Sequence, residues 1–184
     1  MTDRELILGR LADSKGGSVS SVPLTVKTVP SDRLWETFVK RLETLQGELM
    51  DTGALSQFAG RAVYDDDVPV EIKNALGEPV EDVWDAEIGV TMAEFAIAET
   101  GSLVLSATQG RARLNSLAPP VHAVLIDPKN TVSSLEEAFD RMPRETSVII
   151  SGPSRTADVE GIMVMGVHGP KRLWIVPLAE KEPD

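Results

Sequence analysis

Hydrophobic residues recur with a helical period in residues 31–52, and the pattern changes after that segment. Within it, apolar side chains return every three or four positions, and charged residues lie largely on the opposite side. Ser31 is suited to cap such a helix and Gly53 to follow its end. The spacing therefore predicts a long amphipathic helix, whose apolar positions are Leu34, Trp35, Phe38, Val39, Leu42, Leu45 and Leu49.

The rest of the chain carries short apolar runs separated by turn residues, which is typical of strands. Some runs, such as 148–150, are entirely apolar, and this suits strands covered on both faces. Helix signals lie at 131–142, where Ser133 and Glu136 have the spacing of a capping box, and at 156–163. This alternation predicts a layered α/β domain. The expected strands are 62–64, 88–92, 94–98, 103–106, 121–127, 147–151 and 173–178.

The first thirty residues differ in composition from the rest of the chain. Residues 1–13 are suited to a short helix, and residues 14–30 form a Gly- and Ser-rich linker with an extended lead-in. The remaining residues, 31–184, are expected to form one domain, because a chain of 184 residues is too short for two full cores.

The chain is acidic, with 18 Lys and Arg against 29 Asp and Glu and a net charge of −11. This balance argues against a nucleic-acid-binding protein and against binding to an anionic membrane surface. Most of the excess lies in residues 61–100, which hold 2 basic and 11 acidic residues. That stretch is either a solvated acidic surface or a docking face for a basic partner.

The chain contains no Cys and only two histidines, His122 and His168. Disulfides, a thiolate nucleophile, Cys-ligated zinc and a Cys-ligated iron–sulfur cluster are therefore excluded for this chain. No apolar run approaches the about 18 residues of a membrane span, and Met1 is followed by polar residues. We expect a cytoplasmic protein with no membrane span.

Four segments have compositions too specific for generic scaffold: 89–101, 113–122, 151–160 and 166–170. In the third, a buried strand is expected to end at Ser151, to turn at Gly152 and Pro153, and to open a helix at Ser154, Arg155 and Thr156. Free backbone N–H groups at a helix N-terminus attract anions, and Arg155 could grip a carboxylate or phosphate. Alternatively, Ser154 or Thr156 only caps the helix and Arg155 pairs with Asp158 or with the acidic stretch.

Other candidates lie at strand ends and in loops. Glu99 is either a general base or hydroxyl acceptor at a strand end, or an exposed acid in a hairpin turn. Glu94 would need a partner such as Arg113 or Arg155 if its side chain points inward. His168 lies in a glycine-bounded loop, where function is often carried, whereas His122 begins a strand and is more typical of a structural histidine.

Together, in this order, the four segments resemble the LutC/YkgG family, the lactate utilization protein C group that carries the LUD domain. The resemblance spans about residues 55–178 and includes Ala98-Glu99-Thr100-Gly101, Pro119-Pro120-Val121-His122, Ser151-Gly152-Pro153-Ser154-Arg155-Thr156 and Gly166-Val167-His168-Gly169-Pro170. It implies a three-layer α/β fold of the NagB/RpiA/CoA-transferase-like type with a central, mostly parallel sheet.

The resemblance also implies a role in oxidising L-lactate to pyruvate beside two iron–sulfur proteins. The clusters are then expected in those partners, and this chain binds no cofactor of its own. Family members usually have a longer helical N-terminal part. If that part docks the partners, the acidic stretch 61–100 is an alternative docking face here.

On this hypothesis a strand-end pocket binds a small carboxylate. Arg155 would hold the carboxylate, and His168 or Glu99 would handle the hydroxyl proton. One alternative is a stand-alone enzyme or sensor that binds a sugar phosphate, folate or acyl-CoA, and another is a purely structural scaffold. The expected catalytic residues are Glu99 and His168, and the expected binding residues are Thr100, Gly101, Ser151, Gly152, Ser154, Arg155, Thr156 and Asp158.

Overall fold

The computed structural model describes residues 28–143, 146–157 and 163–178. The helix expected at 1–13, the linker up to residue 27 and the candidate Asp158 lie outside these ranges.

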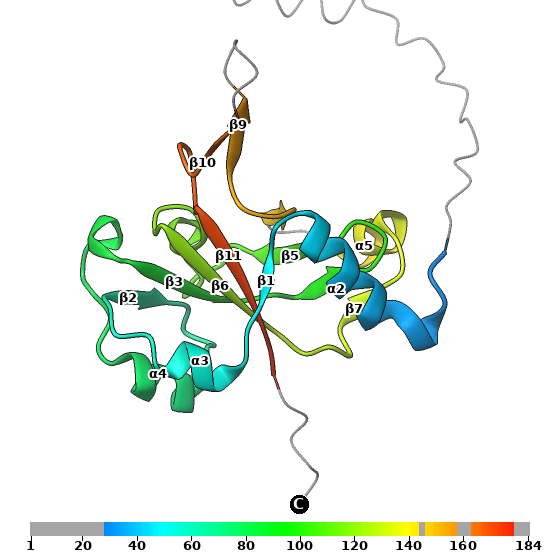
Figure 1. Cartoon of the computed structure of the whole chain (residues 1–184). Helices are drawn as coiled ribbons and strands as arrows, with labels where there is room; N and C mark the ends of the chain where they lie inside the picture. The colour runs from blue at the N-terminus through cyan, green and yellow to red at the C-terminus, as the bar shows by residue number, and fades with distance from the viewer. Residues whose placement is uncertain (1–27, 144–145, 158–162, 179–184) are drawn as a thin grey trace, which may run out of the picture.

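A sheet of five parallel strands forms the centre of the molecule (Figure 1). Its middle strand, β6, is buried along nearly its whole length, as its apolar sequence predicts. Two short helices, α3 (Thr52–Ser56) and α4 (Val70–Leu76), pack on one face of the sheet. In spatial order the strands are β1 (Glu48–Leu49), β11 (Arg172–Pro177), β6 (Val121–Ile126), β3 (Ile88–Met92) and β2 (Ala62–Tyr64).

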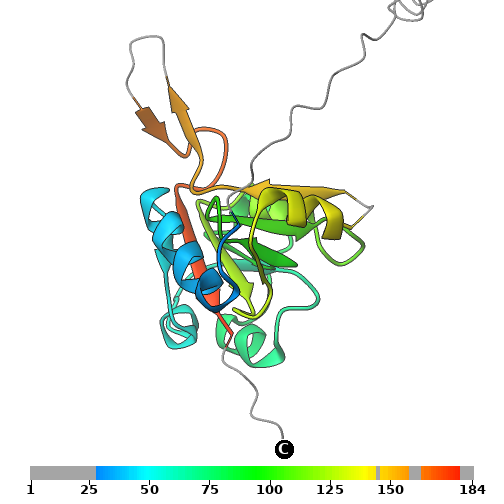
Figure 2. The same ribbon diagram turned by 90° about the vertical axis from the view of Figure 1, so that its right-hand side faces the viewer.

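A second sheet of four strands covers the other face of the central sheet. Helix α2 (Leu34–Thr44) closes the same core with Phe38 and Leu42, and helix α5 (Leu135–Arg141) packs on the outer side of the second sheet (Figure 2). The layered α/β architecture with a central parallel sheet is therefore confirmed. The second sheet runs in the order β7 (Thr131–Val132), β4 (Phe95–Ile97), β5 (Ser102–Ser106) and β8 (Ser147–Ile150).

The amphipathic helix is shorter than the expected 31–52. A 3₁₀ turn at Ser31–Arg33 leads into α2, which ends at Thr44. The amide of Gln46 donates to the carbonyl of Glu43, and that of Gly47 donates to Leu42, with Gln46 at φ 64°. This is the Schellman pattern that ends a helix, and the chain then extends into β1.

The helix expected at 156–163 is wrong at its described residues, 156, 157 and 163, which belong to strands, and residues 158–162 lie outside the described ranges. Strands β9 (Arg155–Ala157) and β10 (Met163–Met165) pair there in antiparallel register and stand out from the body as an arm (Figures 1 and 2). β-branched residues such as Thr156 and Val164, which face each other in this register, favour extended backbone.

Two further expectations need correction. The helix expected from residue 131 begins only at Leu135, because Thr131 and Val132 pair as β7 and Ser134, not Ser133, accepts the capping bond from the Glu137 amide. The all-apolar run 148–150 is not covered on both faces, since β8 is an edge strand whose Ile149 is 37% exposed.

Candidate functional site

Three of the four distinctive segments meet at a cleft of about 250 Å³ beside the amino ends of β6 and β11. Its walls are largely apolar, and its polar side chains are His122, His168, Ser116, Ser151 and Ser154. We call it the inner cleft. The sequence pattern placed a candidate site after the strand that ends near Ser151, and this cleft lies at that end of β8 as well as beside the central strands. The element that follows the turn is the strand β9 and not the expected helix.

His122 is buried in the wall of the inner cleft. It pairs with Gly89 of β3 and Leu173 of β11 in the strand register, and its Nε2 shares a 2.9 Å hydrogen bond with the Thr91 hydroxyl. Burial lowers the pKa of His122 to about 3. The ring is therefore neutral at physiological pH and cannot serve as an acid.

Gly89 allows a 3₁₀ turn, η3 (Arg113–Ser116), to cross the sheet at this point. A Cβ on Gly89 would lie 1.8 Å from the Asn115 carbonyl oxygen. The close crossing brings Ser116 and Leu117 to the wall of the inner cleft. A glycine in a strand marks such a close approach of another backbone.

The opposite wall comes from β8 and the turn after it. Residues along a strand alternate between faces, so Ile150, which packs against the core, and Val148 share one face. Ser151 follows β8 and also lines the inner cleft, and its hydroxyl lies 2.6 Å from that of Ser102.

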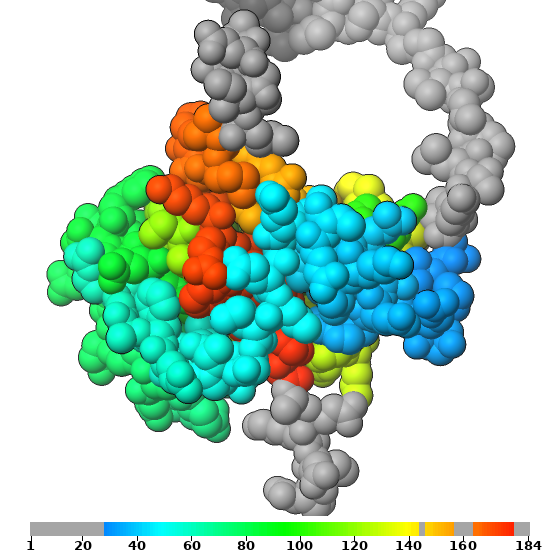
Figure 3. Space-filling model, in the orientation of Figure 1, coloured from blue at the N-terminus to red at the C-terminus, as the bar shows by residue number. Residues whose placement is uncertain are grey.

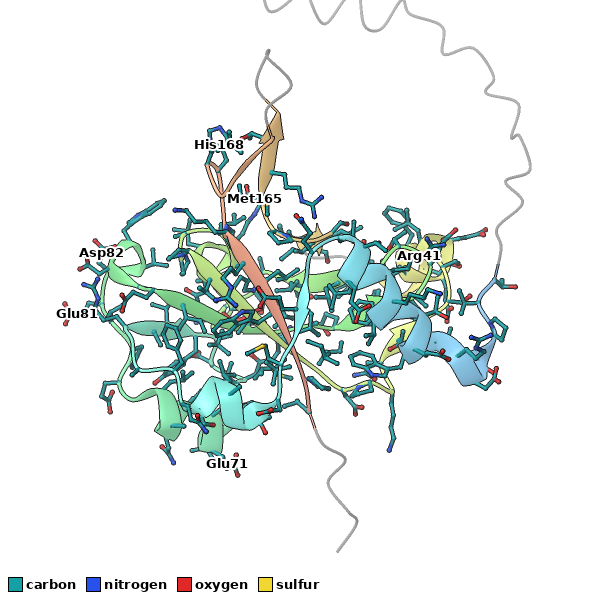
Figure 4. All side chains as sticks on the ribbon, viewed as in Figure 1. Arg41, Glu71, Glu81, Asp82, Met165 and His168 are labelled. Atoms are coloured by element: carbon teal, nitrogen blue, oxygen red, sulfur yellow. The ribbon has the colours of Figure 1, made fainter. Side chains whose placement is uncertain are left out.

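Two loops are tied together at the mouth of the inner cleft. The Ser154 amide donates to the Pro170 carbonyl at 2.9 Å, and the Gly166 amide donates to the Ser154 carbonyl at 2.9 Å. His168, which lies between these contacts in the second loop, is exposed at the mouth near Met165, at the base of the arm (Figure 4). Of the expected site residues, Ser151, Gly152, Ser154 and His168 therefore gather here.

Arg155 and Gly101 instead pack against the carboxyl end of α2, and Gly152 contacts this end as well as the cleft. The Arg155 guanidinium donates to the Leu45 carbonyl. A Cβ on Gly152 would lie 2.7 Å from that same oxygen, and one on Gly101 would lie 2.8 Å from the backbone of Arg41. A cation at a helix C-terminus satisfies a free carbonyl and complements the helix dipole.

Glu99 and Thr100 lie in the turn between the antiparallel strands β4 and β5, away from the inner cleft. The Glu99 carboxylate accepts a 3.1 Å hydrogen bond from the Leu135 amide, in the first turn of α5. The Thr100 hydroxyl is buried without a partner among the described residues. Thr156 belongs to the arm, where its hydroxyl reaches toward the Val164 carbonyl at 3.4 Å.

A cluster of charged residues lies beyond the end of β2, and of its members the sequence pattern singled out only Glu94 by itself. Asp65 is 3% exposed, and its carboxylate accepts a 2.9 Å hydrogen bond from the side-chain amide of Asn115. Burial raises the pKa of Asp65 to about 6. Arg111 forms ion pairs with Asp67 and Glu94, so the partner of Glu94 is neither Arg113 nor Arg155.

These contacts bear on whether the acidic stretch 61–100 forms one exposed acidic surface. Several of its carboxylates are engaged within the chain instead of forming one free face. Glu87, for example, accepts from the Arg61 amide, and Asp82 caps a 3₁₀ turn at Val83–Asp85. Within the described ranges, no group of three or more His, Asp or Glu side chains is arranged to hold a metal ion.

The chain is similar to several known proteins. The LUD domain family matches residues 36–177. Lactate utilization protein C of Halalkalibacterium halodurans is 32% identical over 112 residues, which are 55% of this chain and 48% of that protein. The protein of the same name from Bacillus velezensis is 30% identical over 151 residues, 77% of this chain and 57% of that protein. The uncharacterized protein YkgG of Escherichia coli K12 is 40% identical over 111 residues, 54% of this chain and 47% of that protein.

The chain thus spans about half the length of the curated relatives it matches. A crystal structure of a DUF162 family protein from Deinococcus radiodurans has a TM-score of 0.64 at 20% identity, covering 82% of this chain and 99% of that one. This likeness concerns the fold and agrees with the α/β layers described above. Across the described ranges, no helix has the length and apolar character needed to cross a membrane.

Proposed function

The chain belongs to the LUD domain family, and from this membership we propose that it acts as a lactate utilization protein C-like subunit in the oxidation of L-lactate to pyruvate. Several relatives bear the name lactate utilization protein C. The observation that carries the proposal is their similarity, together with the meeting of three distinctive segments at one cleft.

The roles that we propose for this chain and for its partner proteins follow from the chemistry of the reaction. Oxidation of lactate removes a hydride equivalent from C2 and a proton from the hydroxyl group, so an electron acceptor is required. This chain has no Cys and therefore offers no thiolates for an iron–sulfur cluster. We assign electron transfer to iron–sulfur partner proteins and substrate binding to this chain.

The mouth of the inner cleft is the proposed carboxylate site. His168 supplies an imidazole there, and Ser154 supplies a hydroxyl group. His168 is then the residue that takes the hydroxyl proton. Arg155 is already bonded to the Leu45 carbonyl, so we propose for it a positioning role at the end of α2 instead of the carboxylate grip.

The alternative is a stand-alone enzyme or sensor that binds a sugar phosphate, folate or acyl-CoA, and it rests on analogy of fold. It expects a phosphorylated ligand at the turn 151–156, where the chain continues into the strand β9 and not into the expected helix. Without a row of free helical N–H groups, the turn has no special affinity for phosphate.

An anaerobic pull-down of the tagged chain from lactate-grown source cells tests the proposal. The eluate is assayed for iron, for Cys-rich proteins and for lactate-dependent dye reduction. We expect all three together, and we expect His168→Asn to lower dye reduction at least about tenfold while the partners still co-elute. An iron-free and inactive eluate, under conditions that preserve complexes, would contradict the proposed subunit role.

A further inference from the structure

The inner cleft opens beside a second and larger hollow of about 480 Å³, and both are lined by Leu117, His168 and Gly169. We call this second space the outer hollow. It lies beside the loop before β11, at the top of the body in Figure 3, where the orange and red residues stand next to the green lobe. Spaces of this combined size accommodate ligands much larger than lactate.

The outer hollow is bordered by apolar side chains that are unusually exposed. Trp84 is 71% exposed, Val167 53% and Leu114 46%, and all three line it. Single exposed apolar residues are ordinary, but their grouping around one concave surface indicates a site that contacts an apolar partner or ligand.

The charges around the two spaces have one sign. The chain has 29 acidic residues and a net charge of −11, yet no Asp or Glu of the described ranges lines the inner cleft or the outer hollow. The ionisable side chains that line the outer hollow are Lys171 and His168. A cation in a concave site without carboxylates favours an anionic ligand, in a protein whose overall field would repel one.

No Lys, Arg, Asp or Glu of the described ranges lines the inner cleft, and the hydroxyl groups of Ser116 and Ser151 are bonded to Arg113 and Ser102. The Thr91 hydroxyl shares a hydrogen bond with Nε2 of His122, and this residue is 1% exposed. The surrounding side chains include Leu117, Val148, Ile150 and Leu173. An environment of this kind accepts an apolar chain, whereas burying a charge there would be costly.

We propose that the two spaces together bind an organic monocarboxylate larger than lactate, with its carboxylate between His168 and Lys171 and its apolar chain in the inner cleft. The inference rests on the carboxylate site of the proposed function and names the ligand class of that site. Trp84, Leu114 and Val167 then flank the carboxylate end of the ligand and reduce its contact with water.

Titration calorimetry of the full chain with straight-chain monocarboxylates from propionate to decanoate tests the ligand class. Affinity should rise about fourfold with each added methylene until the inner cleft is filled. Octanamide, which has the same length as octanoate but no charge, should bind about tenfold more weakly. Equal affinity for short and long acids would overturn the inference.

Two variants locate the ligand. Lys171→Gln should weaken octanoate binding about tenfold and leave octanamide binding unchanged. Lys40→Gln, on the exposed face of α2, is the matched control and should change the affinity for neither ligand. Val148→Phe should narrow the inner cleft and weaken decanoate binding more than propionate binding, with thermal unfolding used to confirm that the variant is folded. Octanoate binding that is unchanged in Lys171→Gln would contradict the placement of the carboxylate.

The outcomes separate this inference from the proposed function. If lactate binds and longer acids do not, the larger ligand class is wrong and the lactate site stands. If no acid binds to a chain that supports lactate-dependent dye reduction in its complex, the subunit role stands and the mouth of the inner cleft is not its carboxylate site.

Discussion

At the scale of single residues, Gly89 shows how one missing side chain positions the site. Its Cα lies under η3, and a Cβ would lie 1.8 Å from a backbone oxygen that cannot rotate away. Gly89→Ala should therefore displace η3 and lower the free energy of unfolding by about 1–3 kcal/mol. Denaturant-induced unfolding followed by circular dichroism measures the change.

Gly53→Ala is the control for this substitution. The nearest atom to its Cβ is the flexible Asp51 carboxylate oxygen, at 3.0 Å, and the position is within α3. Stability should change by less than about 0.5 kcal/mol there. Equal effects of the two substitutions would show that η3 does not press on the strand.

His122 makes stability depend on pH. Its pKa is about 3 in the folded chain and near the ordinary 6.5 when unfolded, so the unfolded chain binds the extra proton between these values. The neutral ring makes its full contribution to the free energy of unfolding above about pH 6.5. This contribution is lost as the pH falls, on the order of 1 kcal/mol per pH unit. His122→Gln should flatten this part of the profile, as measured by unfolding at a series of pH values.

Asp65 acts in the opposite direction within the same pH range. Its pKa is raised from 3.8 to about 6, so the folded chain binds the proton more tightly and gains stability as the pH falls between these values. Asp65→Asn keeps an acceptor for Asn115 and should make acid destabilisation steeper than it is in the unsubstituted chain. A pH profile that is identical in Asp65→Asn would contradict a raised pKa at this position.

At the scale of elements, the end of α2 contains a residue that the motif does not prefer. Gln46 occupies the left-handed position of the Schellman turn at φ 64°, where glycine adopts this backbone without a Cβ penalty. Gln46→Gly should stabilise the chain by about 0.5–1 kcal/mol, visible as a rise in the midpoint of thermal unfolding. A lower midpoint would show that the glutamine side chain contributes a contact that outweighs this backbone strain.

Glu99 links the β4–β5 turn to the start of α5. Because its carboxylate accepts from the Leu135 amide, Glu99→Gln should cost about 0.3–1 kcal/mol of stability and leave lactate-dependent dye reduction within about twofold. Loss of activity by about a hundredfold or more, at unchanged stability, would instead identify Glu99 as the general base.

The elements that the sequence predicted well are those whose signal is local. The buried strands β3 and β6 follow from apolar runs, and α2 follows from its helical period. The arm was missed because the short stretch from Arg155 onward carries capping residues that serve a turn as well as a helix start. The length of α2 was overestimated because Leu45 and Leu49 continue the helical spacing, although the Schellman turn between them redirects the chain.

At the scale of the whole molecule, the sequence identified the loops of the site but not the walls that η3 and the central strands contribute. Residues of 151–154 and His168 were singled out from composition, and they do gather at one cleft. The role of His122 in its wall, the crossing of η3 over Gly89 and the bond from Arg155 to Leu45 depend on tertiary register, for which the local pattern has no signal. The Asp65, Asn115 and Arg111 contacts were missed for the same reason.

The central claim is that this chain is a required, non-redox subunit of a lactate-oxidising assembly. Reconstitution tests it most directly: the iron-containing partners are purified anaerobically from cells that lack this chain, and dye reduction is measured with L-lactate before and after the chain is added back. We predict little activity from the partners alone and full activity with the chain at a saturating ratio. Full activity without the chain would contradict the claim.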